Sequence, residues 1–188
     1  MSVETVELFY GLLALVAFAV VIGVVVLRLV ALVSASAADA WEATVRALAP
    51  SAIPMAWVVA LLATAGSLYF SEIAHFEPCR LCWYQRIAMY PLVVILGIAT
   101  VRRDRSGARY GLALALIGAV VAAYHVTLEW FPSLDGGTCD PANPCTLLWF
   151  RVFGFISLPT LALSAFLLIA SLLAIRLATR DEPLEEVS

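Results

Sequence analysis

Five apolar runs, each near the length of a bilayer crossing, constrain this 188-residue chain more than any other feature of it. A helix needs about 20 consecutive apolar residues to cross the hydrocarbon core of a bilayer. The runs cover residues 8–33, 54–73, 81–101, 110–130 and 152–175. The sequence therefore predicts an all-α integral membrane protein with five transmembrane helices.

Composition supports a membrane protein and excludes one class of function. Hydrophobic residues make up 63% of the chain and charged residues 13%, and the mean hydropathy is +0.99. A soluble domain carries about 25% charged residues. The chain has no lysine, its formal net charge is -3, and its arginines form no stripe that could follow a nucleic acid.

The arginines predict how the runs are oriented. They flank the links between the first and second runs and between the third and fourth, and they follow the fifth run. They are Arg28, Arg46, Arg102, Arg103, Arg105, Arg109, Arg176 and Arg180. All these places fall on one side if the runs alternate, and the positive-inside rule makes that side cytoplasmic. The remaining two links, in which or directly beside which all four cysteines lie, are then extracytoplasmic, and so is the N-terminus.

The runs divide the chain into three parts. Residues 1–50 are expected to form a separate N-terminal transmembrane helix and an amphipathic cytoplasmic linker, residues 51–178 a four-helix bundle, and residues 179–188 an acidic cytoplasmic tail. The segment 35–37 is similar to a signal-peptide cleavage site. The acidic start and the length of the first run instead favour a retained helix.

The first cysteine pair is a C-x-x-C motif, Cys79 and Cys82, with Arg86 four residues later. A helix N-terminus favours the thiolate form of a cysteine. Arg86 lies on the same helical face as Cys82, so its charge is expected to favour the Cys82 thiolate further. An arginine this close to an apolar run is unusual without a function. By itself, a C-x-x-C pair also fits half a zinc site or a structural bridge.

The second pair, Cys139 and Cys145, lies in a loop rich in glycine and proline. An exposed disulfide there would exchange readily with a partner protein, and the alternative is a bridge that only orders the loop. His125 falls near the outer end of its run. It either hydrogen-bonds a quinone oxygen or passes a proton, or it is an interfacial side chain without chemistry.

Residues 79–86, Cys-Arg-Leu-Cys-Trp-Tyr-Gln-Arg, followed by Met89-Tyr90-Pro91, resemble the first catalytic loop of the DsbB/BdbC disulfide bond formation proteins. The stretch from Tyr124-His125 to Cys139 and the segment 154–159 resemble later parts of the same family. The likeness covers about residues 54–175. It implies a DsbB-type four-helix bundle, here with one additional N-terminal helix, in the bacterial cytoplasmic membrane.

The resemblance also implies roles for individual residues. Cys79 and Cys82 would form the quinone-linked pair, with the Cys82 thiolate next to a ubiquinone or menaquinone contacted by Arg86 and His125. Cys139 and Cys145 would face a thioredoxin-like (DsbA-type) thiol oxidase, and Cys139 would form the mixed disulfide. The chain would then reoxidise this partner, pass its electrons to quinone, and so support disulfide formation in extracytoplasmic proteins.

Two other hypotheses also fit the sequence. A vitamin K epoxide reductase-like protein also joins cysteine pairs to quinone on a similar bundle, although the motif around Arg86 argues against it. A non-enzymatic membrane protein could use its four cysteines structurally or to hold zinc. The chain also departs from the family pattern, because it has the additional N-terminal helix and a short, proline-rich second loop similar to the Gram-positive branch.

Overall fold

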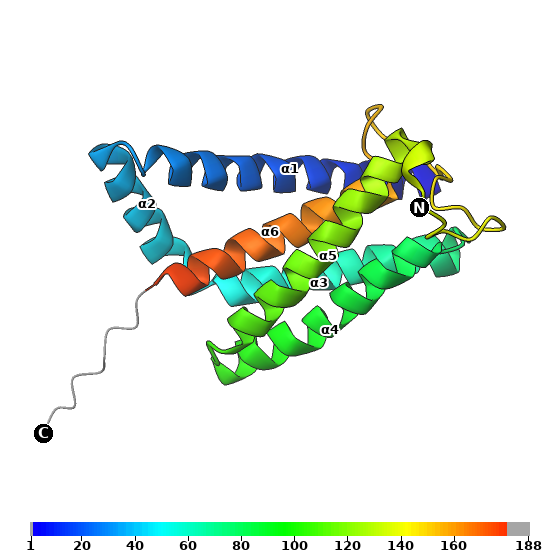
Figure 1. Ribbon diagram of the computed structural model, residues 1–188. Coiled ribbons are helices and arrows are strands. Elements are labelled where there is room, and N and C mark those ends of the chain that lie inside the picture. Colours follow the sequence, from blue (N-terminus) through cyan, green and yellow to red (C-terminus); the bar gives the residue numbers. More distant parts are fainter. Residues whose placement is uncertain (1, 180–188) are drawn as a thin grey trace, which may run out of the picture.

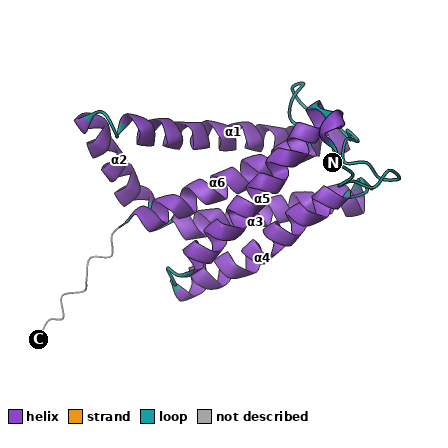
Figure 2. Cartoon of the chain, in the orientation of Figure 1, coloured by secondary structure: helices purple, strands orange, loops and turns teal. Residues whose placement is uncertain are grey.

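The fold is helical throughout the residues that the structure describes. The structure is a computed structural model, and it describes residues 2–179. Its α-helices are α1 (Val3–Val30), α2 (Ala35–Leu48), α3 (Ala52–Leu68), α4 (Arg80–Arg102), α5 (Gly107–Trp130) and α6 (Leu158–Ala178). A π-helical turn, η1 (Tyr69–Ile73), continues α3, and a single 3-10 turn, η2 (Pro132–Leu134), follows α5. Figure 2 shows helices and loops and no strand in this part of the chain.

Five of these helices are long and apolar enough to cross a membrane: α1, α3 with η1, α4, α5 and α6. The predicted all-α membrane fold with one helix beyond the four-helix bundle is therefore confirmed. The remaining helix, α2, is short and forms the amphipathic linker expected between the first two runs.

Helices α3 to α6 form the bundle, in which α5 packs on α4 and α6 while α3 packs on the same two helices. Small residues allow the close approach that helix packing in a membrane depends on. On α3 they are Ala52, Ala56 and Ala60, all fully buried. On α5, Gly118 accommodates the ring of Phe166, since a Cβ atom at this position would lie 2.2 Å from that ring.

Helices α1 and α2 lie beside the bundle. Figure 1 shows α1 converging on α6 at the end of the molecule that carries the long loops and α2 crossing back to the bundle at the other end. There, Val45 and Ala49 pack against Ile175 of α6. Arg28 stacks over the Trp41 ring at 5.4 Å and so joins α1 to α2.

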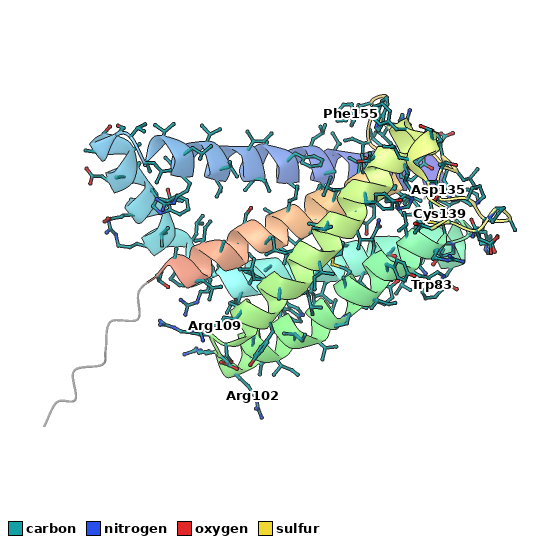
Figure 3. All side chains as sticks on the ribbon, in the orientation of Figure 1. Trp83, Arg102, Arg109, Asp135, Cys139 and Phe155 are labelled. Atoms are coloured by element: carbon teal, nitrogen blue, oxygen red, sulfur yellow. A yellow bond between two sulfur atoms is a disulfide. The ribbon has the colours of Figure 1, made fainter. Side chains whose placement is uncertain are left out.

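The two ends of the bundle differ in chemistry. Figure 3 shows Arg102 and Arg109 at one end and Trp83, Asp135 and Cys139 at the opposite end. The alternation of the helices thus separates the arginine-rich link from both cysteine segments, as the sequence predicted.

Two helix boundaries differ from the sequence-based expectation. The fifth run was expected to become helical near Val152, but α6 begins at Leu158, because residues 152–156 form a tight turn. Phe153 and Gly154 both have positive φ in this turn, which a helix does not allow. The first run was expected at 8–33, but its helix covers Val3–Val30. The predicted acidic tail falls, except for Thr179, outside the described residues.

The π-helical turn η1 directs the chain toward the first cysteine pair. The Ser71 hydroxyl lies within hydrogen-bond distance of the backbone oxygens of Ser67 and Leu68 and of the Glu72 carboxylate, and a serine bond to the preceding turn bends helices. His75 then adopts a left-handed backbone conformation with φ of 59° and ends the helical path. Phe76 follows, and its ring stacks between Phe70 and Trp149. This stack fixes the segment before Cys79 against the end of the second cysteine loop.

Candidate active site

Cys79 and Cys82 lie at the start of α4. Cys79 is the N-cap residue, and its sulfur accepts a hydrogen bond from the backbone N–H of Cys82 at 3.3 Å. The two sulfur atoms are 2.8 Å apart and belong to free thiols. Because the N-terminal N–H groups carry partial positive charge, they favour an anion at Cys79. The sequence predicts this effect for Cys82, which is instead the third residue of the helix.

The pKa of Cys79 lies well below the ordinary value of a thiol. The main cause is the hydrogen bond with the Cys82 thiol, which favours the Cys79 thiolate, and a hydrogen bond with His125 acts in the same direction. Burial raises the pKa and opposes both, but does not cancel them. Cys79 is therefore the thiol of this pair that the surroundings prepare to be a thiolate.

His125 connects the two cysteine pairs. Its ring is buried on α5, and Nε2 lies 2.9 Å from the backbone oxygen of Cys145 and 3.7 Å from the sulfur of Cys79. A backbone oxygen can only accept, so Nε2 carries the proton. Nδ1 accepts from the side-chain amide of Gln85 at 3.1 Å. These contacts fix the tautomer of the imidazole and place its N–H between Cys79 and the second loop.

Cys139 and Cys145 form a disulfide. Both residues share a small apolar cluster with Cys79, Leu81 and Leu128. The second loop is held over the first by two hydrogen bonds: Arg80 donates to the backbone oxygen of Thr138 at 2.9 Å, and Asn143 donates to that of Pro78 at 3.3 Å. The two cysteine pairs are thus assembled at one place, although 57 positions separate Cys82 from Cys139 in the sequence.

The burial of the second pair differs from the expectation of an exposed disulfide. Cys139 is 7% exposed and Cys145 only 1%, while the neighbouring loop residues Asp140 and Pro141 are exposed. The glycines and prolines predict an exposed loop, but they do not reveal that the loop folds its cysteines inward onto α4 and α5. A protein that attacks Cys139 must therefore displace part of this loop.

Arg86 projects from α4 toward α3. It donates from Nε to the hydroxyl of Ser67 at 3.1 Å and from a terminal nitrogen to the backbone oxygen of the same residue at 3.0 Å. It also stacks on Trp83 at 5.2 Å. These partners are neutral, so they orient the guanidinium without neutralising its charge. The remaining donor positions are available to a carbonyl or anionic oxygen.

A cavity of about 260 Å³ lies beside this arginine. Its walls come from α1, α3, η1, α4 and α6, and most of the lining is aliphatic or aromatic. The polar lining residues include Ser67, Glu77, Cys82, Gln85 and Arg86. Cys82 is the cysteine that reaches this cavity, and it also lines, together with Cys79 and His125, a smaller cavity next to Cys145. Whether His125 also contacts a quinone stays a prediction.

The site contains two residues whose roles do not follow from the motifs in the sequence. Gln85 is 8% exposed, hydrogen-bonds His125 and lines the cavity. Ser67 anchors Arg86 and also hydrogen-bonds the Tyr90 hydroxyl. An amide inside an apolar run is a signal that could have identified Gln85. Ser67 gives no such signal, because serine is common in membrane helices.

Three side chains of the site could also hold a metal ion. The ligand atoms of Cys79, Cys82 and His125 all lie within 4.8 Å of one another. Two thiolates and an imidazole are ligands that zinc accepts. The zinc-binding alternative therefore has a definite location, and it would occupy the same thiols that a redox relay requires.

Together, the membrane bundle, the free C-x-x-C pair and the adjacent disulfide define a multi-pass membrane protein of the thiol oxidoreductase class. Comparison with known proteins agrees with this class. The family model described as "Disulfide bond formation protein DsbB" matches residues 49–176. The chain belongs to this family.

Curated relatives from bacilli carry corresponding names. "Disulfide bond formation protein C" of Bacillus subtilis is 53% identical over 114 residues, which are 60% of this chain and 83% of the relative. "Probable disulfide formation protein C" of Halalkalibacterium halodurans is 49% identical over 123 residues, 64% of this chain and 90% of the relative. No solved structure matches the chain. Family membership gives this protein a role in disulfide bond formation as a thiol oxidoreductase.

Proposed function

We propose that this protein reoxidises a thioredoxin-like thiol oxidase and passes the electrons through its two cysteine pairs to a membrane quinone. The observation that carries the proposal is the convergence of both pairs on one cluster, with His125 between them and Cys82 facing the cavity beside Arg86. A relay needs its two disulfides close together and an acceptor site at one end only.

The thiol exchange balances with the residues present. A reduced partner attacks the Cys139–Cys145 disulfide, becomes oxidised, and leaves Cys139 and Cys145 as thiols. These thiols then reduce a Cys79–Cys82 disulfide and re-form their own bond. Cys79 shares the apolar cluster with Cys139 and Cys145, so attack on its sulfur would release the Cys82 thiolate on the side of the cavity. The His125 N–H lies beside both the Cys79 sulfur and the second loop.

The cavity fits a quinone by its chemistry. Its apolar walls suit a quinone ring, and Arg86 supplies hydrogen-bond donors and a positive charge for an oxygen that gains negative charge. Its volume is close to the lower end of the roughly 300–1,000 Å³ of small-molecule sites, so the rest of a long isoprenoid tail would extend into lipid. When bound, a quinone would supply the two-electron, two-proton acceptor. Cys82, Gln85, Ser67 and Arg86 would hold its ring.

The proposed location follows from the separation of charges in the fold. The arginine-rich end, with Arg102 and Arg109, would face the cytoplasm, and both cysteine loops would face outward from the bacterial cytoplasmic membrane. Disulfides persist in that oxidising environment. Labelling of single cysteines introduced at position 106 and position 136, with a reagent that does not cross the membrane, tests this orientation. Only position 136 should react in intact cells.

The function itself is tested by mixing purified full-length protein, a reduced thioredoxin-like partner and a ubiquinone analogue. We expect quinone reduction that the Cys82→Ser substitution abolishes. If Cys82→Ser leaves turnover intact, the relay is wrong. If instead the untreated protein carries about one zinc ion per chain and reduces no quinone, the zinc-binding function is favoured.

A further inference from the structure

Helix α1 lies outside residues 49–176, which the family model matches, yet it lines the cavity proposed to hold quinone. Its buried residues are Val6, Gly11, Ala14 and Ala17, and none follows Ala17. The α1 residues that line the cavity are Tyr10, Leu13, Ala14, Val16 and Ala17. The additional helix therefore supplies one wall of the proposed site rather than only an anchor.

The Tyr10 side chain connects α1 to α3, which forms the opposite wall of the cavity. Helix α1 packs mainly on α6, and Tyr10 crosses to α3, where its hydroxyl donates to the backbone oxygen of Leu62 at 3.1 Å. The Tyr10 ring meets the Phe70 ring edge-on, with centroids 5.9 Å apart. In the membrane, a Tyr hydroxyl needs such a partner, because no water replaces it.

Gly66 makes this crossing possible. A Cβ atom at position 66 would lie 2.6 Å from the Tyr10 ring, so any larger residue would push the ring away. The next residue, Ser67, is the one that anchors Arg86. Tyr10 from α1 and Arg86 from α4 thus reach consecutive residues of α3, and both line the cavity.

We propose that Tyr10 is a positioning residue that holds α1 across the opening between α3 and α6 and closes the quinone site on its membrane-facing side. This inference rests on the proposed quinone function. In this account, α1 adds contact area for the quinone ring and the first part of its tail, and the tail leaves the site beside α1. Loosening α1 should therefore weaken quinone binding and leave the thiol chemistry unchanged.

The test is a titration of purified full-length protein with decylubiquinone, followed by quenching of tryptophan fluorescence, since Trp149 lines the cavity. We expect Tyr10→Ala and Gly66→Ala each to raise the Kd about tenfold, which corresponds to about 1.4 kcal/mol. Tyr10→Phe, which loses only the hydrogen bond to Leu62, should have a smaller effect of about threefold. The Tyr10→Ala/Gly66→Ala double variant should match Tyr10→Ala alone, because both substitutions disturb one contact.

Gly23→Ala is the matched control, because Gly23 belongs to the same helix as Tyr10 and a Cβ atom at position 23 would meet nothing within 4 Å. It should leave the Kd unchanged. In turnover, the Tyr10 variants should raise KM for quinone while kcat and the rate of partner exchange stay constant, a pattern that general misfolding would not give. If the wild-type protein binds quinone and the Tyr10 and Gly66 variants bind it equally well, this inference is wrong. If the wild-type protein does not bind quinone, the proposed function is wrong as well.

Discussion

The Nε2 atom of His125 lies 3.7 Å from the sulfur of Cys79, while the same nitrogen donates to the backbone oxygen of Cys145 at 2.9 Å. One imidazole N–H on α5 therefore contacts the C-x-x-C pair and the disulfide loop together. The side chain that helps to lower the pKa of Cys79 therefore also holds the backbone of Cys145 in place.

Replacing His125 should make Cys79 less acidic. The pKa of Cys79 is lowered partly by its hydrogen bond with His125, so His125→Ala should raise it. Because the thiolate is the reactive form, the curve of Cys79 alkylation against pH should move to higher pH, with slower alkylation below the new pKa. Mass spectrometry can assign the alkylated residue. Thr127→Ala is the control, since that hydroxyl bonds only to its own helix, and an equal displacement in both variants would contradict the assigned role of His125.

Substitutions of two arginines near the cysteines should affect different steps of the relay, one the reduction of quinone and the other the exchange with the partner. Arg86→Met should raise KM for quinone at least about tenfold, since a hydrogen bond to a charged group contributes about 1.5–3 kcal/mol. Partner exchange should change little. Arg80→Met should change the rate of partner exchange and leave the KM for quinone nearly unchanged, because Arg80 holds the loop at Thr138, next to Cys139. Separate assays of quinone reduction and partner oxidation measure both. Equal losses in both assays for Arg86→Met would show that this arginine mainly anchors the fold.

The inward-folded loop should limit access to the second disulfide. Asn143→Ala removes the hydrogen bond to the backbone oxygen of Pro78 and should loosen the loop. We expect dithiothreitol to reduce Cys139–Cys145 a few-fold faster, since a net hydrogen bond contributes about 1 kcal/mol. The rate is read from quenched samples by thiol labelling. Ala142→Gly, at an exposed neighbouring position, is a control for general flexibility, and an unchanged rate in Asn143→Ala would show that this bond does not close the loop.

Packing between α5 and α6 should depend on Gly118. Gly118→Ala places a methyl group in the space of the Phe166 ring, and overpacking of this kind costs about 1–3 kcal/mol. The Tm of the detergent-solubilised protein should fall, and adding Phe166→Leu should restore part of the loss. A Tm equal to that of the wild type would contradict this close contact.

The sequence was sufficient for the fold class and the family, because apolar length and motif spacing are local signals. It placed Cys79, Cys82 and Arg86 together correctly, since they belong to one helix start. It missed the turn at 152–156, where an apolar composition masks two positive φ angles. It also missed the burial of Cys145 and the crossing of Tyr10 to Gly66, which depend on contacts between segments far apart in the chain. No local pattern reports such contacts.

The central claim is tested most directly by counting electrons under anaerobic conditions. Purified full-length protein receives a reduced thioredoxin-like partner and excess ubiquinone analogue, and both products are measured. The account predicts one quinol formed for each partner disulfide formed, with no quinol from Cys82→Ser and none from Cys139→Ser. Partner oxidation without quinol, or undiminished quinol formation in either variant, would contradict it.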